Sequence, residues 1–178
     1  MRSCKPRPPP SWTPSSWPAS TSPSKVNYDL PVKNEIIRVG QIEIAFLLEA
    51  TESNGSLAMF EFAVPAGAKV PAPHSHAHYD ETIYGVEGVI TFTVDGKDLP
   101  IGPGESCFIR RGAVHGFRNL HSGQAKALAV VTPARIGPDF FKEAAAIVNA
   151  GGPPDLARMK EVMLRHGLVP ATSTSPSK

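Results

Sequence analysis

Short apolar stretches separated by turn signals fill the middle of this chain, and they limit the folds that it can adopt. Most of them alternate apolar and polar residues, as β-strands with one buried face do. Strands are predicted at residues 35–39, 41–50, 57–64, 81–86, 89–96, 106–110 and 125–133. Short strands at such regular spacing indicate a β-sandwich or a small β-barrel. A nucleotide-binding α/β fold is not supported, because no glycine-rich phosphate loop links a strand to a helix.

Towards the C-terminus the apolar period becomes helical. In "PDFFKEAAAIVNAGG" (138–152), Asp139 is expected to cap the helix start and Gly151 its end. Its apolar face comprises Phe140, Ala144, Ile147 and Val148. In "PDLARMKEVMLRHG" (154–167), Asp155 is the expected cap and Gly167 the stop, and the apolar face comprises Leu156, Met159 and Met163. We expect both faces to pack on the outside of the barrel or on a dimer partner rather than to bind a cofactor.

The first 25 residues differ from the rest in composition, with seven prolines, seven serines, four basic residues and no acidic residue. Such a segment cannot build a core. The remainder holds 14 basic and 16 acidic residues, so the positive net charge comes from the tail and no nucleic-acid partner is indicated. We therefore expect a disordered tail (1–25), a barrel (26–135), a helical extension (136–170) and a flexible tail (171–178). A targeting role for residues 1–25 stays open.

Two further features bear on where the protein works. No apolar run approaches the roughly 20 residues that cross a bilayer, so no membrane association is expected. The two cysteines lie in different contexts, Cys4 in the tail and Cys107 inside "SCFI". A disulfide framework is therefore not expected, which favours a reducing compartment, the cytoplasm.

The stretch "PHSHAHYDE" (73–81) carries three histidines at alternate positions, with a glutamate behind them. On a strand these imidazoles share one face, but an ion held by two of them leaves the third about 6–7 Å further along. Glu81 lies at odd spacing from His76, so it reaches the same ion only if the chain turns at residues 77–80. Two imidazoles and one carboxylate are good ligands for a divalent transition metal.

A further ligand is predicted in "GPGESCFIRRGAVHGFRN" (102–119), where His115 lies at a strand start inside an apolar frame. By contrast, His121 lies in a polar turn and His166 in the last turn of a helix, where a cation suits the helix dipole. The candidate metal ligands are His74, His76, Glu81 and His115.

Two motifs in this chain resemble those of the cupin superfamily. The first cupin motif is Gly, five or six residues, His-x-His, three or four residues, Glu, six residues, Gly, and its counterparts here are Gly67, His74, His76, Glu81 and Gly88. The second is Gly, five residues, Pro-x-Gly, two residues, His, three residues, Asn. Its counterparts are Gly104, Arg110, Gly112, His115 and Asn119, with Arg110 in place of the proline. The resemblance covers roughly residues 35–135.

The resemblance implies an all-β fold, the cupin double-stranded β-helix (jelly-roll barrel), here with two C-terminal α-helices. Its spacing selects the pair His74 and His76 and leaves His78 outside the ligand set. It also implies one divalent metal ion, with Fe(II) favoured and Mn, Ni or Zn as alternatives, and a homodimer. The apolar runs "EIIRV" and "IEIAFLL" support pairing, because they carry few of the charges that protect sheet edges.

The function that follows is a metal-dependent oxygenase acting on a small organic, phenolic substrate. A non-redox isomerase, lyase or decarboxylase is the alternative, and a ligand-binding cupin without turnover is the third hypothesis. Aromatic residues of the predicted strands are expected to line or support an apolar pocket: Phe60, Phe62, Tyr84, Phe92, Phe108 and Phe117.

Overall fold

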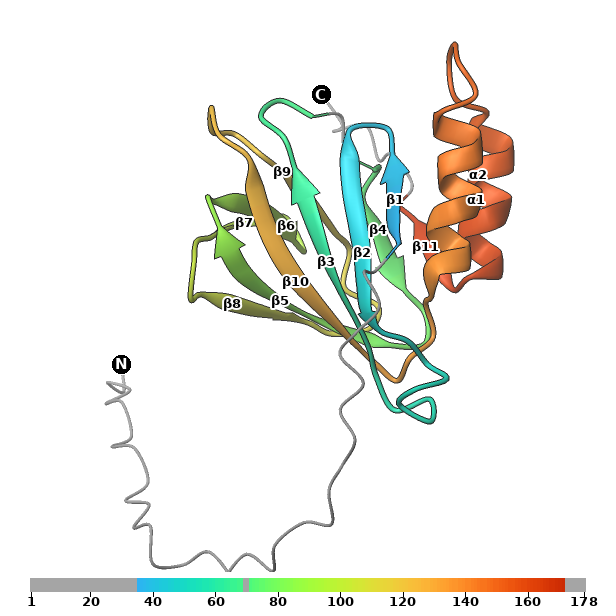
Figure 1. Cartoon of the computed structure of the whole chain (residues 1–178), viewed down its shortest axis with the longest axis horizontal. Helices are drawn as coiled ribbons and strands as arrows, with labels where there is room; N and C mark the ends of the chain where they lie inside the picture. Colours follow the sequence, from blue (N-terminus) through green and yellow to red (C-terminus); the bar gives the residue numbers. More distant parts are fainter. Residues whose placement is uncertain (1–34, 69–70, 172–178) are drawn as a thin grey trace, which may run out of the picture. The chain divides into compact units, whose positions relative to one another are not determined.

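The computed structural model describes residues 35–68 and 71–171, which form two antiparallel sheets and two helices (Figure 1). The six-stranded sheet has the order β1 (Ile36–Val39), β2 (Ile42–Leu48), β3 (Ala58–Val64), β10 (Ala125–Thr132), β5 (Asp80–Glu87) and β8 (Ser106–Ile109). The five-stranded sheet has the order β11 (Leu168–Pro170), β4 (His74–His76), β9 (His115–Arg118), β6 (Ile90–Val94) and β7 (Lys97–Ile101). The predicted all-β jelly-roll barrel with two C-terminal helices is confirmed.

All seven predicted strands are present, and the differences fall on short strands. The strand predicted at 89–96 ends at Val94, because Asp95 and Gly96 both have positive φ and form a turn that pairs Val94 with Lys97. Strand β7 was missed because four of its five residues are exposed, which leaves no apolar alternation to recognise. Strands β4 and β11 have three residues each, too few for a period to show.

Helix α1 (Pro138–Val148) begins and ends differently from the prediction. Gly137 is the N-cap and makes no side-chain capping bond, so Asp139 lies inside the first turn, where its charge suits the helix dipole. The C-cap is Asn149 rather than Gly151. The Asn149 side chain accepts a hydrogen bond from the Gly40 N–H (2.9 Å) and donates one to the Arg38 carbonyl (2.8 Å), so the helix end is tied to the β1–β2 turn.

Helix α2 (Leu156–Arg165) follows the prediction at both ends. The Asp155 carboxylate accepts a hydrogen bond from the Arg158 N–H at 3.0 Å, and Gly167 follows the C-cap with a φ of +77°. Neither helix of the described part of the chain has the length and apolar character needed to cross a membrane.

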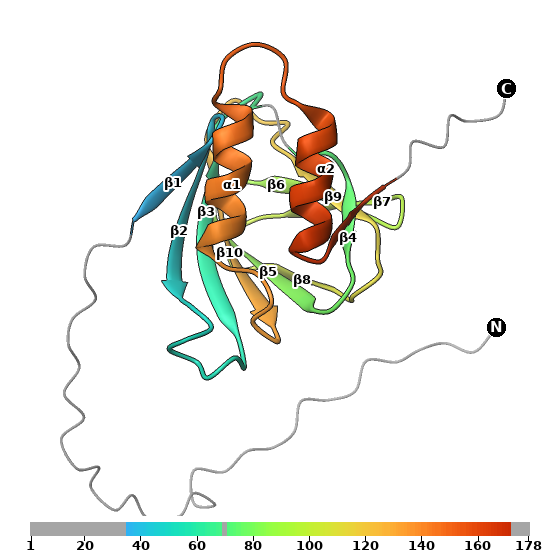
Figure 2. The same cartoon turned by 90° about the vertical axis from the view of Figure 1, so that its right-hand side faces the viewer.

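The two helices lie side by side in front of the space between the two sheets (Figure 2). Their apolar faces do not simply pack on the outside of the barrel, as expected, but line a cavity that enters it. Leu156 was assigned to this face and is largely exposed, because it lies in the first turn of α2 at the rim. The expected tails, 1–25 and 171–178, lie outside the described residues apart from Ala171, so their character stays a prediction.

Candidate metal centre

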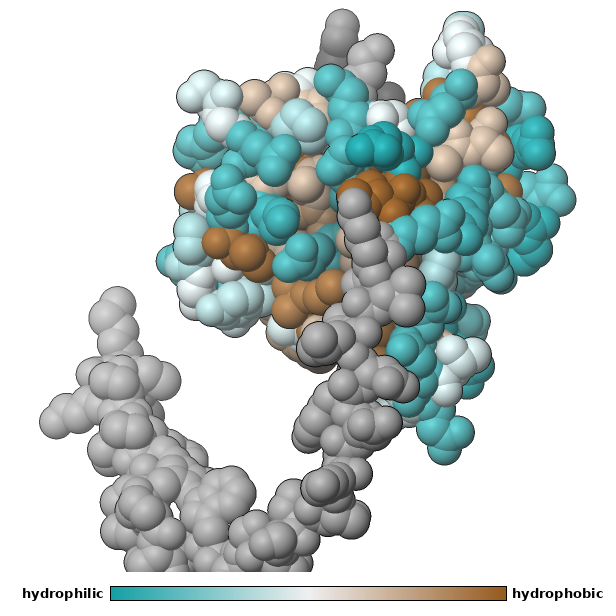
Figure 3. Space-filling view, in the orientation of Figure 1, coloured by the Kyte–Doolittle hydropathy of each residue, from teal (hydrophilic) through white to brown (hydrophobic). Residues whose placement is uncertain are grey.

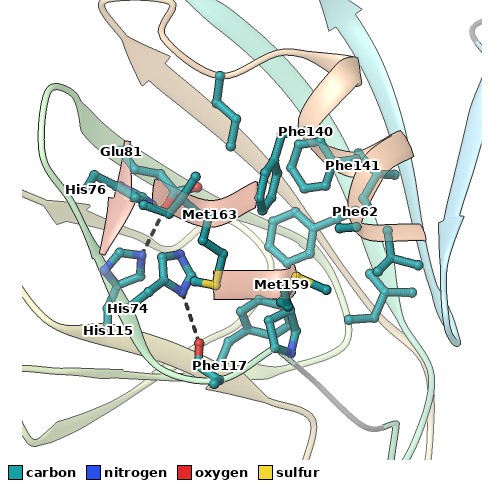
Figure 4. A pocket seen from close by; sticks show the side chains of 18 of the residues that line it. Phe62, His74, His76, Glu81, His115, Phe117, Phe140, Phe141, Met159 and Met163 are labelled. Atoms are coloured by element: carbon teal, nitrogen blue, oxygen red, sulfur yellow. Dashed lines mark hydrogen bonds and ion pairs between the residues drawn. The ribbon is translucent and has the colours of Figure 1, made fainter. Parts of the chain in front are cut away.

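Three histidines meet between the sheets because two short strands pair. Strand β4 carries His74 and His76, β9 begins at His115, and His74 is the register partner of His115. One nitrogen of each ring lies within 4.8 Å of the other two, so the three rings could hold a metal ion. Figure 4 shows the imidazoles converging at one end of a cavity.

Glu81 approaches from the opposite sheet, on strand β5. The chain bends at residues 77–78 after β4, which is where the sequence required a turn. The Glu81 Oε2 atom lies 3.4 Å from His115 Nε2. Only 12% of the Glu81 side chain is exposed. The structure therefore brings all four candidate ligands together, although Glu81 is not one of the three residues whose ligand atoms lie mutually within 4.8 Å.

Backbone carbonyls orient two of the rings. His74 Nδ1 donates to the Ala72 carbonyl at 3.1 Å, and His115 Nδ1 donates to the Ala113 carbonyl at 3.0 Å. Since a carbonyl only accepts, the proton of each neutral ring lies on Nδ1 and the Nε2 lone pair is free to bind a metal. The Nε2 lone pair of His115 then faces a carboxylate oxygen, an arrangement that a cation between the two atoms would stabilise.

The electrostatics of the cluster suit metal binding. Burial, together with the neighbouring His115, lowers the pKa of His74 to about 4 and that of His76 to about 3. Burial also opposes the charged form of His115, but the Glu81 carboxylate and the Ala113 carbonyl together outweigh it and raise the pKa of this ring. For Glu81, burial alone would raise the pKa, and the pairing with His115 and the other rings holds it below its ordinary value. His74 and His76 are therefore neutral beside an ionised carboxylate, as a metal requires, and His115 must be neutral as well when it binds one.

His76 supplies a direct test of whether an ion fits this cluster. Its Nδ1 atom is buried and has no hydrogen-bond partner among the described residues. An unpaired buried polar atom costs on the order of 1–3 kcal/mol. An ion bound at this atom would compensate the cost, and three imidazoles beside a carboxylate are a ligand set that fits a divalent transition metal.

The remaining histidines lie elsewhere. His78 is exposed on the bend between β4 and β5, outside the three-histidine cluster, and His121 is exposed in its turn. His166 lies at the end of α2, with its Nε2 atom 3.0 Å from Glu143 Oε1. The structure thus leaves His78 apart from the cluster, while the ligand assignment itself stays a prediction.

Salt bridges fix the loop that precedes His115. Asp80 accepts hydrogen bonds from the Arg111 backbone N–H (2.7 Å) and from its guanidinium group (2.7 and 3.2 Å). These bonds hold the pKa of the Asp80 carboxyl at about 2. Arg110, which replaces the motif proline, forms a 3.2 Å ion pair with Asp95, and both side chains are well exposed. Such an exposed pair contributes little stability.

Comparison with known proteins decides the family. A family model described as "Cupin domain" matches residues 60–131. The oxalate-binding protein of Thermotoga maritima is 31% identical over 93 residues, which are 52% of this chain and 76% of that protein. The chain belongs to the cupin superfamily.

Other relatives show how far this similarity extends. The quercetin 2,3-dioxygenase of Bacillus subtilis is 32% identical to this cupin over 76 residues, 43% of the chain, but the match spans only 22% of the length of that enzyme. Among solved structures, a "predicted oxalate decarboxylase" from Thermotoga maritima has a TM-score of 0.50 and 27% identity, covering 57% of this chain and 93% of that chain.

An apolar cavity of about 400 Å³ opens from the histidine cluster of this cupin. Four of the six predicted aromatic residues line it: Phe60, Phe62, Phe92 and Phe117. Tyr84 and Phe108 do not, because their strands turn these side chains to the outer face, where they are 45% and 65% exposed. The prediction was wrong for these two residues.

Sequence reasoning missed Tyr79, which lines the cavity beside the cluster. Its ring stacks on His76 with centroids 4.2 Å apart, and the residue is 0% exposed. The hydroxyl group has no hydrogen-bond partner among the described residues. Burial, and after it the Glu81 charge, raises the pKa of this phenol, so the group stays neutral. Its position between the histidine run and Glu81 was the only signal in the sequence.

Proposed function

We propose that this cupin is a metal-dependent oxygenase of the dioxygenase type, acting on a small organic substrate bound in the cavity. The observation that carries this proposal is the position of the cluster: His74, His76 and His115 lie at the end of an apolar cavity large enough for a small molecule. A bound Fe(II) ion with such ligands would supply open positions for substrate and dioxygen. The likeness to a quercetin 2,3-dioxygenase supports oxygen chemistry.

The residues of the chain contribute orientation and exclusion of water. The carbonyls of Ala72 and Ala113 hold two imidazoles in the tautomer that presents Nε2. The Glu81 carboxylate, 3.4 Å from His115 Nε2, neutralises positive charge at the cluster. Phenylalanine rings around the cavity keep bulk water from a substrate, which strengthens electrostatic interactions at the cluster.

A non-redox isomerase, lyase or decarboxylase is the second candidate, because the same ligands bind Mn, Ni or Zn as Lewis acids. The likeness to a solved structure named as a predicted oxalate decarboxylase supports this candidate. The third candidate is a ligand-binding cupin without turnover, which the relative named as an oxalate-binding protein supports.

The test compares turnover with and without dioxygen. Protein loaded separately with Fe(II), Mn(II), Ni(II) or Zn(II) is incubated with a panel of phenolic compounds, aerobically and anaerobically, and substrate loss and oxygen uptake are measured. We expect Fe(II)-dependent loss of substrate with stoichiometric oxygen uptake. His74→Ala should abolish it, whereas His121→Ala, a change at an exposed histidine, should not. Equal turnover without oxygen would establish the non-redox candidate, and binding without any turnover would establish the third.

A homodimer and a cytoplasmic location are also proposed. Strand β1 does not require a partner copy, since α1 of the same chain lies against it. A better surface is the outer face of the six-stranded sheet, where Tyr84 and Phe108 are exposed on neighbouring strands. Figure 3 looks onto this side and shows apolar areas among hydrophilic ones. Light scattering at micromolar concentration should give twice the chain mass of 19.0 kDa, and a mass near 19.0 kDa would contradict the dimer.

A further inference from the structure

The wall of the cavity opposite the strands comes from the two helices, which lie beyond the segment that matches the cupin family model. Helix α1 contributes Phe140, Phe141 and Ala144, and α2 contributes Met159 and Met163. The Phe141 ring contacts the rings of Phe46 (5.7 Å), Phe60 (5.2 Å) and Phe140 (5.0 Å), so this part of the wall is well packed. Figure 4 shows Met159 and Met163 between the histidine cluster and these rings.

The chemistry of the lining is almost entirely apolar. Its polar members among the described residues are the three histidines, Glu81 and Tyr79, and it includes no Lys, Arg, Asn, Gln, Ser or Thr. A phosphate or a second carboxylate on the substrate would therefore find no cationic partner away from the cluster. Burying such a group unpaired costs several kcal/mol, as does burying the hydroxyl groups of a sugar. The lining excludes these classes of molecule by lack of partners.

The helical wall is held in register with the cluster. Strand β11, which directly follows α2, pairs with β4, and Leu168 is the register partner of His76. The Ala77 N–H also donates to the Gly167 carbonyl at 2.8 Å. Met163 lies one helical turn before this pairing and is 7% exposed. Main-chain hydrogen bonds therefore hold the C-terminal end of α2 next to the strand that carries His74 and His76.

We propose that this cavity selects an uncharged, largely apolar molecule with one polar group directed at the histidine cluster, and that Met159 and Met163 set the size of the apolar part. This inference rests on the proposed function only in that both place a small molecule beside the histidine cluster. Methionine suits such a role because its unbranched side chain adapts to the shape of the molecule against it.

The test uses calorimetry to measure the equilibrium binding of three probes to the Zn(II)-loaded protein. The probes share one polar group and differ at the far end: phenol, 4-butylphenol and 4-hydroxybenzenesulfonate. We expect 4-butylphenol to bind at least tenfold more tightly than phenol, because each buried CH₂ group contributes about 0.8 kcal/mol. The sulfonate should bind at least tenfold more weakly than phenol. Equal or tighter binding of the sulfonate, or no binding of 4-butylphenol, would overturn the proposal.

Variants of α2 test the assigned residues. Met163→Trp should weaken 4-butylphenol binding at least tenfold and phenol binding less than threefold, since only the longer probe needs that space. Met163→Leu conserves the volume and should retain tight binding. The matched control is Leu164→Trp, at the neighbouring, half-exposed position, which should change neither probe. If Met163→Trp does not fold, Met159→Trp makes the same test.

Unchanged 4-butylphenol binding in the folded tryptophan variants would show that the helices do not set the size. Because Zn(II) replaces Fe(II) and no oxygen is consumed, a failure of this experiment is separate from a failure of the oxygenase assay.

Discussion

The barrel segment that matches the family model, residues 60–131, and the C-terminal segment of α1, α2 and β11, residues 138–170, contribute differently to one cavity. All four candidate metal ligands belong to the first segment. The second contributes no candidate ligand and supplies the methionine and phenylalanine wall. The comparison teaches that the candidate metal ligands and the helical wall of the cavity come from separate stretches of the chain.

The two segments also differ in how precisely their side chains must be positioned. Metal ligands must lie within fractions of an ångström of their positions, which the pairing of His74 with His115 and the turn before Glu81 provide. An apolar wall tolerates changes of shape if its volume is conserved. Substitutions in the helices should therefore change stability or ligand size while leaving metal content alone.

The largest effect that should separate the segments is that of Ile147→Ala. Ile147 of α1 is buried against the core and does not line the cavity, so its loss should lower the free energy of unfolding by about 2–5 kcal/mol. The folded protein should still bind one metal ion per chain. Chemical denaturation and metal analysis of the folded fraction check both points, with Ile147→Val as the milder control. Loss of metal from the folded variant would show that the helical segment also determines metal binding.

An effect of opposite sign is expected for Tyr79→Phe in the barrel segment. Removing a buried hydroxyl that has no described partner, while keeping the ring stacked on His76, should stabilise the metal-free protein by about 1 kcal/mol. For a chain of this size that is a rise in Tm of about 2–4 °C. A fall in Tm would show that the hydroxyl group forms a hydrogen bond in solution.

The smallest effect concerns the contact between the two helices. Glu143 of α1 pairs with Arg165 and with His166 (3.0 Å). The hydrogen bond to His166, and then the Arg165 charge, hold the pKa of the Glu143 carboxyl below its ordinary value of 4.5. A carboxyl with a lowered pKa in the folded state stabilises it above the ordinary pKa, and this stability is lost as the pH falls through the lower value.

Glu143→Gln should therefore lower Tm at pH 7 and lower it less at pH 3. The effect should be small, because the Arg165 and Glu143 side chains are 54% and 37% exposed. Thermal unfolding at several pH values measures the difference. Glu161→Gln, a change at an exposed residue of α2, is the control. A difference between wild type and Glu143→Gln that stays constant from pH 7 to pH 3 would show that the carboxylate charge is not its source.

Much of the barrel could be predicted from the sequence, because strands with one buried face show alternation. The proximity of His74, His76, Glu81 and His115 could be predicted as well, because each of them lies next to a turn that is recognisable in the sequence, whereas their role as ligands stays a prediction. Which face of a strand points inward could not be predicted everywhere: "ETIYGV" and "SCFIR" place Tyr84 and Phe108 on the outer face. In both strands apolar residues occupy both faces, so the local pattern does not distinguish them.

The cavity wall also escaped prediction, for a different reason. The apolar faces of the helices were recognised, but their partner depends on where the chain places them in space. That placement results from the β11–β4 pairing and from the bonds of Asn149 with the β1–β2 turn. Both are contacts between residues far apart in sequence, made by a three-residue strand and a single side chain.

The central claim is that the ion is held by the ligands His74, His76, Glu81 and His115. Metal analysis of purified His76→Ala and His78→Ala, two residues apart on the same stretch, tests it most directly. His76 is buried in the cluster and His78 is exposed on the following bend. We predict that His76→Ala loses most of its bound metal and that His78→Ala keeps a near-normal content. A large loss in His78→Ala, or normal metal in His76→Ala, would contradict the assignment.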